Sequence, residues 1–146
     1  MEEKTRGEKL PRLPASGIGS YGVEGCLFIH VEQIDEDQCG PADIREAVDD
    51  AVNLAMLDQQ RADGFASEQT FLFGFSQGCL MTLEVGLRYP YKFAGLIGIS
   101  GYAHEPDKLV AEQSPVAAEQ SFLITHGTAD PLLPLAQTKT QMEQLQ

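Results

Sequence analysis

The feature that most constrains this 146-residue chain is the pentapeptide Gly74-Phe-Ser-Gln-Gly78, which stands between two different hydrophobic patterns. The apolar run Thr70–Phe75 predicts a buried strand, and apolar residues at helical spacing follow over residues 77–89. A serine on a sharp turn between a strand and a helix holds its hydroxyl in the open, and the N–H behind it can face a developing negative charge. The flanking glycines suit such a turn, because the backbones approach too closely for a Cβ atom.

The rest of the chain alternates between strand-like and helix-like segments. Strands are expected at residues 26–31, 93–100 and 121–125, long helices at residues 42–62 and 135–146, and a short helix within the polar residues 101–120. This alternation predicts an α/β domain with a mostly parallel sheet flanked by helices. Residues 1–22, rich in Gly, Pro, Ser and charge, are expected to be a loop or disordered leader, and residues 23–146 to form the domain.

Composition narrows the classes of partner and compartment. The formal net charge of −12 disfavours nucleic acid and anionic membranes as partners. The charged start of the chain lacks the apolar core of a signal peptide, and no apolar run approaches the roughly 20 residues that span a bilayer, so no stable membrane insertion is expected. Three cysteines without a C-x-x-C pair and three scattered histidines predict neither a metal site nor a disulfide framework. A reduced, cytoplasmic setting is expected.

Two side chains are candidates for hydrolytic chemistry. Ser76 is the candidate nucleophile, and a serine hydroxyl needs an adjacent base to become reactive. The pentapeptide alone also suits an ordinary turn, but its place between a strand and a helix favours the nucleophile. Asp130 ends the segment His126-Gly-Thr-Ala-Asp130, which follows an expected strand, and sites assemble at the carboxyl ends of parallel strands. A carboxylate there can orient an imidazole; the alternative is a simple Asp-Pro turn.

Together these segments resemble the phospholipase/carboxylesterase branch of the α/β-hydrolases, which includes the acyl-protein thioesterases. The glutamine after Ser76 is typical of that branch. The resemblance covers roughly residues 70–136, and residues 23–62 more loosely. The matching segments are Gly74-Phe-Ser-Gln-Gly78, Arg88-Tyr-Pro90, Phe93-Ala-Gly95, Ser100-Gly-Tyr102 and His126-Gly-Thr-Ala-Asp130, with Pro134.

The resemblance implies a partial α/β-hydrolase fold and the hydrolysis of carboxylic esters or thioesters through an acyl-enzyme. Ser76 takes the place of the nucleophile, Asp130 that of the triad acid, and the backbone N–H of Gln77 that of one oxyanion-hole donor. The expected substrate is a small-molecule acyl ester or thioester. No metal or organic cofactor is implied, because the reaction needs only proton transfer and charge stabilisation.

The sequence departs from the family pattern at two places. Residues 1–22 contain no equivalent of the early His-Gly loop that supplies the second oxyanion donor, and no histidine follows Asp130. His30, His104 and His126 all precede it, and none is assigned to the triad. The chain is therefore expected to be a fragment of a longer hydrolase or a degenerate family member. The alternative functions are a non-catalytic binding module or pseudoenzyme and a peptidase of the same fold, and the glutamine after Ser76 favours an esterase.

Overall fold

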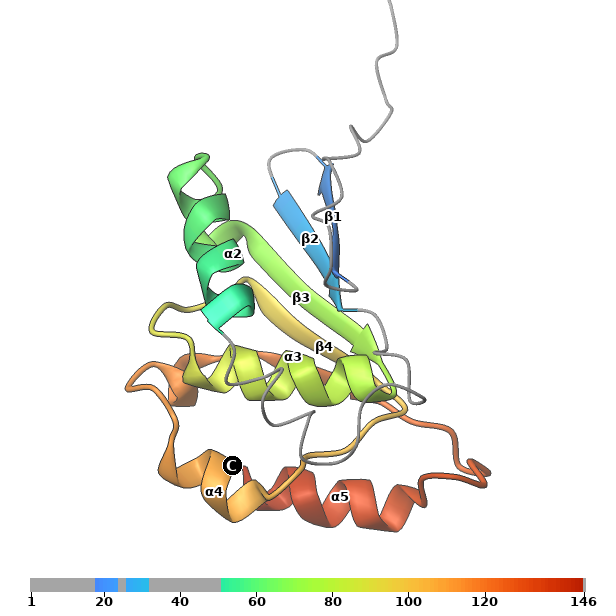
Figure 1. Cartoon of the computed structure of the whole chain (residues 1–146). Helices are drawn as coiled ribbons and strands as arrows, with labels where there is room; N and C mark the ends of the chain where they lie inside the picture. Colours follow the sequence, from blue (N-terminus) through green and yellow to red (C-terminus); the bar gives the residue numbers. More distant parts are fainter. Residues whose placement is uncertain (1–17, 24–25, 32–50, 146) are drawn as a thin grey trace, which may run out of the picture.

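Five strands form one sheet in the part of the chain that the computed structural model describes, which is residues 18–23, 26–31 and 51–145. The strands lie side by side in chain order: β1 (Ile18–Val23), β2 (Cys26–Val31), β3 (Thr70–Phe75), β4 (Gly95–Ile99) and β5 (Phe122–Thr125) (Figure 1). β1 is antiparallel to β2, and the pairs β2–β3, β3–β4 and β4–β5 are parallel. The four strands expected from the sequence and the mostly parallel sheet are thereby confirmed.

Strand β1 was not expected. It occupies residues 18–23, so the expectation of a loop or leader is wrong for residues 18–22, while residues 1–17 lie outside the described part. Two glycines and a serine give this segment a turn-like composition and a low strand propensity. The strand forms because it pairs with β2 along its whole length, from Ile18 opposite Val31 to Val23 opposite Cys26. That pairing satisfies backbone groups irrespective of side-chain preference.

Helices α2 (Ala51–Ala62), α3 (Gln77–Arg88) and α4 (Pro106–Ala111) connect the parallel strands, as the alternating pattern predicted, and a further helix, α5 (Leu135–Gln144), follows β5. The 3-10 turns are η1 (Ser67–Gln69) and η2 (Ala117–Glu119). The helix expected at residues 42–62 is confirmed from residue 51, and residues 42–50 lie outside the described residues. Among the described helices, none combines the length and apolar character that crossing a membrane requires.

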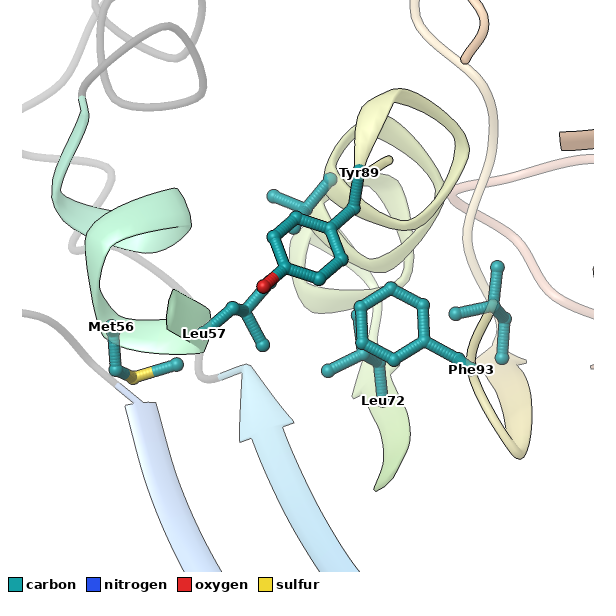
Figure 2. Packing of buried hydrophobic residues seen from close by; sticks show 7 residues of the cluster. Met56, Leu57, Leu72, Tyr89 and Phe93 are labelled. Carbon is teal, nitrogen blue, oxygen red and sulfur yellow. The ribbon is translucent and has the colours of Figure 1, made fainter. Parts of the chain in front are cut away.

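Helix α3 is the centre of the hydrophobic core and is buried from Gly78 to Leu87. One cluster joins α3 to α2, β3 and β4, and its members are Met56, Leu57, Leu72, Val85, Tyr89, Phe93 and Leu96 (Figure 2). A second cluster joins α3 to α4 and η2, and its members are Cys79, Leu83, Leu87, Ala103, Leu109 and Ala117. Because side chains at both clusters hold α3, the position of its first turn is fixed by the core.

The two faces of the central strand β3 differ in burial. Thr70, Leu72 and Gly74 are buried, whereas the alternate positions are more open and Phe75 is 56% exposed. Ile99, the neighbour of Phe75 in the β3–β4 register, is also exposed. The almost continuous apolar run predicted that both faces of this strand are covered by other parts of the protein. Within residues 18–23, 26–31 and 51–145, one face is fully covered and the other only partly, so the expectation is half met for this part of the chain.

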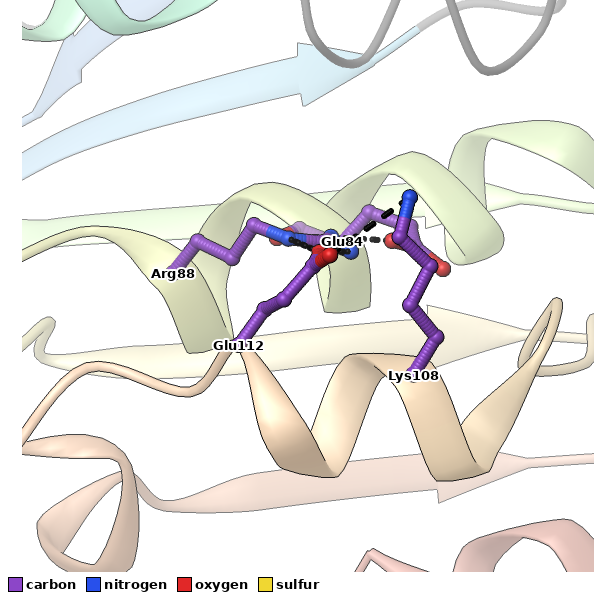
Figure 3. Close-up of polar contacts among 4 residues, drawn as sticks. All are labelled: Glu84, Arg88, Lys108 and Glu112. Atoms are coloured by element: carbon purple, nitrogen blue, oxygen red, sulfur yellow. Dashed lines mark hydrogen bonds and ion pairs between the residues drawn. The ribbon is translucent and has the colours of Figure 1, made fainter.

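A chain of charged side chains joins α3 to α4 (Figure 3). Glu84 is buried in α3 and forms an ion pair with Arg88 one turn later. Arg88 also reaches Glu112 just after α4, with Nη2 2.7 Å and Nε 3.0 Å from the same carboxylate oxygen. Lys108 lies 3.5 Å from the other oxygen of Glu112. Burial raises the pKa of Glu84, while the hydrogen bond from Arg88 lowers the pKa of Glu112.

We expect Arg88→Met to destabilise the protein by about 2 kcal/mol at pH 7, because it leaves the Glu84 carboxylate buried without its partner. Without Arg88, the pKa of Glu84 in the folded protein rises further. A carboxyl group whose pKa is raised by folding stabilises the protein at low pH, and this stabilisation is lost as the pH rises through the raised pKa. Arg88→Met also removes the ion pair that lowers the pKa of Glu112. A lowered carboxyl pKa stabilises the folded protein only at pH values above the usual pKa of 4.5, so this loss also reduces stability at pH 7 more than at lower pH. Urea denaturation should therefore show a smaller deficit near pH 4.5 than at pH 7.

Lys108→Met is the matched control for this prediction. Its ion pair with Glu112 is exposed on both sides and joins residues four apart, so we expect a change within about 0.5 kcal/mol. The prediction is contradicted if Arg88→Met lowers the free energy of unfolding no more than Lys108→Met does, or by an amount that does not depend on pH. Either result would show that the buried carboxylate of Glu84 does not need Arg88.

Candidate active site

Ser76 occupies a sharp turn between β3 and α3, which we call the Ser76 turn (residues 74–78). Its backbone angles, φ 55° and ψ −117°, lie in a region that residues with a side chain rarely adopt. A Cβ atom on Gly74 would lie 2.7 Å from the Cα of Gly78 and would clash with the carbonyl of that residue. The strand, the turn and the helix expected around Ser76 are thus all confirmed. Its role as a nucleophile stays a prediction.

The Ser76 turn is tied to its surroundings through the backbone. The N–H of Ser76 donates to the carbonyl of Ile99 in β4 at 2.9 Å, and the N–H of Cys79 donates to the carbonyl of Ser76 at 3.0 Å. Gln77 is the first residue of α3, so its N–H belongs to the positive end of the helix dipole. This position is compatible with a donor to an oxyanion, the role that the sequence predicts for Gln77.

Asp130 lies in the loop between β5 and α5, where its carboxylate organises the backbone. Its Oδ1 accepts hydrogen bonds from the N–H groups of Leu133 at 3.0 Å and Leu132 at 2.9 Å. These two donors, that of Leu133 first, lower the pKa of Asp130, and the charge of His126 adds to the effect. The simple turn considered for Asp130 is therefore present. It also keeps the carboxylate ionised, as a group that orients an imidazole requires.

Ser76 and the loop of Asp130 lie at the same edge of the sheet. The β3–β4 register pairs Phe75 with Ile99, and the β4–β5 register pairs Ile99 with Thr125. Ser76 and the loop that begins after Thr125 therefore leave the sheet at the same level, with β4 between them. Two strand spacings separate β3 from β5, which is roughly 10 Å.

The three histidines follow or belong to different elements. His126 follows β5, and its Nδ1 lies 3.0 Å from the carbonyl of Gly127. His104 precedes α4, and its charge acts on Glu84, two turns along α3 from Ser76. His30 is in β2. Within residues 18–23, 26–31 and 51–145, no recorded hydrogen bond joins a histidine to Ser76 or Asp130.

Three neighbours of the Ser76 turn were not predicted to belong to the site, although Ser100 and Gly101 lie in one of the segments that carry the family resemblance. Ser100, directly after β4, also has a left-handed backbone, with φ 47°. A Cβ atom on Gly101 would lie 2.8 Å from the carbonyl oxygen of Ser76 and 2.6 Å from Cys79 Sγ. Cys79 is fully buried, and burial raises the pKa of its thiol to about 11, so this cysteine is a packing residue beneath the turn. A Ser-Gly pair after an apolar strand is the only sequence signal for this contact.

The match with known families decides the identity of this fold. Residues 30–146 match the sequence model of the Phospholipase/Carboxylesterase family. The chain belongs to this family. The architecture is accordingly that of an α/β-hydrolase, and the resemblance seen in the sequence is confirmed.

Individual members of the phospholipase/carboxylesterase family support this assignment. The acyl-protein thioesterase 1 of Schizosaccharomyces pombe is 39% identical over 79 residues, which are 54% of this chain and 35% of the relative. An acyl-protein thioesterase 1 homolog of Dictyostelium discoideum is 28% identical over 129 residues, covering 83% of this chain and 54% of the relative. The crystal structure of Arabidopsis thaliana SOBER1 matches with a TM-score of 0.63 and 29% identity, over 77% of this chain and 50% of that one. The chain thus spans about a third to a half of these relatives.

Proposed function

We propose that this chain carries the nucleophile and the acid of a serine hydrolase that acts on small-molecule carboxylic esters or thioesters. The observation that carries the proposal is the backbone of Ser76, held at φ 55° between a strand and a helix, at the sheet edge where the Asp130 loop also begins. Backbone strain of this kind is concentrated at functional sites. Membership of a family that includes acyl-protein thioesterases supports the same reaction class.

In the proposed reaction the Oγ of Ser76 attacks the acyl carbonyl carbon and gives its proton to a base. The carbonyl oxygen becomes an oxyanion, which the N–H of Gln77 stabilises at the N-terminus of α3. Collapse of this intermediate breaks the ester or thioester bond, and the alcohol or thiol leaves with the proton. Water then attacks the acyl group on Ser76, releases the carboxylic acid and restores the hydroxyl.

The base in this scheme is a histidine that Asp130 orients. The ionised state of Asp130 suits that task, because a carboxylate stabilises the imidazolium formed during the transfer. We assign no histidine of this chain to the role.

The cytoplasmic location expected from the sequence also remains a prediction.

A non-catalytic binding module is the second candidate. The observation that favours it is that, among the described residues, neither Ser76 nor Asp130 has a recorded hydrogen bond to a histidine. A protein of this kind would keep the turn and the acid loop and would perform no turnover.

A fluorophosphonate probe, followed by peptide mass spectrometry, separates the two candidates. We expect the probe to label Ser76 in the folded chain. Labelling should vanish in Ser76→Ala and persist in Ser121→Ala, which removes an exposed serine on the approach to β5. Absence of label from protein that is folded by circular dichroism would contradict the hydrolase proposal and favour the binding module.

A further inference from the structure

The chain leaves β4 through Ser100-Gly101, which lies against the Ser76 turn. Ser76 donates its N–H to Ile99 at 2.9 Å, so the end of β4 is bonded to the turn. A Cβ on Gly101 would come within 2.8 Å of the carbonyl oxygen of Ser76, which places the backbone of Gly101 in close contact with the first turn of α3. A displacement of Gly101 is therefore transmitted directly to Ser76.

Both segments in this contact have an unfavourable backbone. Ser76 has φ 55° and Ser100 has φ 47°, and neither is glycine. Such conformations persist only where the surrounding structure over-determines them. On one side Ser100 is held by its N–H, which donates to the carbonyl of Thr125 in β5 at 2.8 Å.

Thr138 in α5 provides the restraint on the other side. Its side chain is buried, and its Oγ1 donates a hydrogen bond to the carbonyl of Gly101 at 3.0 Å. Two other threonine hydroxyls bond within their own helices, that of Thr82 to Gly78 and that of Thr140 to Ala136. Thr138 differs from both because it connects α5 to a segment far away in the sequence.

The position of α5 gives this hydrogen bond a second consequence. α5 begins at Leu135, directly after the loop in which Asp130 accepts the N–H groups of Leu132 and Leu133. The hydroxyl of Thr138 thus fastens the helix that ends the acid loop to the segment that supports the Ser76 turn. This buried hydrogen bond therefore links the two halves of the candidate site from the side of α5, in addition to the backbone hydrogen bonds through β4 and β5.

We propose that Thr138 is a positioning residue of the active site: by holding Gly101, it keeps the Ser76 turn in its strained conformation and in register with the Asp130 loop. The proposal rests on the hydrolase function for its catalytic consequence. Its structural part, the restraint of Ser76 and Ser100, is independent of catalysis and can be measured separately.

The structural part is tested by hydrogen exchange in three variants. Thr138→Val removes the hydroxyl at nearly constant shape, Thr138→Ser retains it, and Thr140→Val makes the same change on α5 away from Gly101. We expect the amides of Ser76 and Ser100 to exchange roughly tenfold faster in Thr138→Val. They should remain close to the wild-type rate in the other two variants. Unchanged exchange of both amides in folded Thr138→Val would overturn the proposal.

The catalytic part is tested by the kinetics of fluorophosphonate inactivation. We expect the maximal inactivation rate to fall roughly tenfold in Thr138→Val with little change in the concentration for half-maximal rate, because the reactive geometry and not probe binding is altered. Thr138→Ser should restore the rate. An equal fall in Thr140→Val, or no fall in Thr138→Val, would overturn a positioning role.

The two proposals fail in different ways. Wild-type chain that does not react with the probe contradicts the hydrolase function, and the exchange rates then still decide whether Thr138 restrains the Ser76 turn. If Thr138→Val does not fold, Thr138→Ala takes its place in both experiments. Alanine also removes the hydroxyl that donates to Gly101, and its side chain is smaller than that of threonine.

Discussion

Gly74→Ala is expected to destabilise the protein by at least about 3 kcal/mol. The added methyl group would meet the backbone of Gly78, lying 2.7 Å from its Cα and clashing with its carbonyl. The position of a Cβ atom is fixed by its own backbone, so no rotamer change relieves its clash with the backbone of Gly78. β3 and α3 must therefore move apart, although α3 is held by the core on both sides. The cost therefore reaches or exceeds the upper end of the roughly 1–3 kcal/mol typical of overpacking. Urea denaturation followed by circular dichroism measures it.

Gly127→Ala is the matched control for stability. A Cβ atom there would meet nothing nearer than 3.9 Å, so we expect a change within about 0.5 kcal/mol. A Gly74→Ala protein that is as stable as the Gly127→Ala protein would mean that the close crossing of β3 and α3 at the Ser76 turn is wrong.

Ser76→Ala is expected to abolish ester and thioester hydrolysis and to leave the fold intact. Loss of the nucleophile lowers kcat by roughly a millionfold in a serine hydrolase whose base is in place, and by less where the base is missing, because the triad acts as a unit. The stability should change by less than about 1 kcal/mol. Alanine keeps the Cβ atom, and the serine side chain makes no capping hydrogen bond at the start of α3. Turnover of a p-nitrophenyl ester and of an acyl thioester, measured beside thermal unfolding, checks both expectations.

The outcome that contradicts this prediction is hydrolysis by Ser76→Ala at the wild-type rate. Activity would then arise from another group or from a contaminant. Cys79 is not such a group, because it is fully buried and its thiol pKa is about 11. Loss of activity together with unfolding would instead assign Ser76 a structural role.

Much of the sheet could be predicted from the sequence because its signals are local. The apolar run Thr70–Phe75 and the helical spacing after Ser76 specify a strand, a turn and a helix without reference to the rest of the chain. Strand β1 could not be predicted in this way. Its glycines suggest a loop, and only its pairing with β2 makes it a strand.

The candidate site was predictable to a similar extent. The pentapeptide and the His126–Asp130 segment point to Ser76, Gln77 and Asp130, since motif and strand order are visible in the sequence. The contact of Thr138 with Gly101 has no local signal, because a hydrogen bond between such distant residues depends on how α5 packs. The partial exposure of the sheet beside Phe75 was also hidden, because an apolar strand has the same composition whether one face or both faces are covered.

The most direct test of the central claim is the detection of an acyl group on Ser76. The chain is mixed with excess p-nitrophenyl ester or acyl thioester, quenched in acid and digested, and the peptide that contains Ser76 is analysed by mass spectrometry. We predict that this peptide gains the mass of the acyl group in the wild-type chain and in Ser121→Ala, and does not gain it in Ser76→Ala. Folded wild-type chain that carries no acyl group, or carries it only on another residue, would contradict the assignment of Ser76 as the nucleophile.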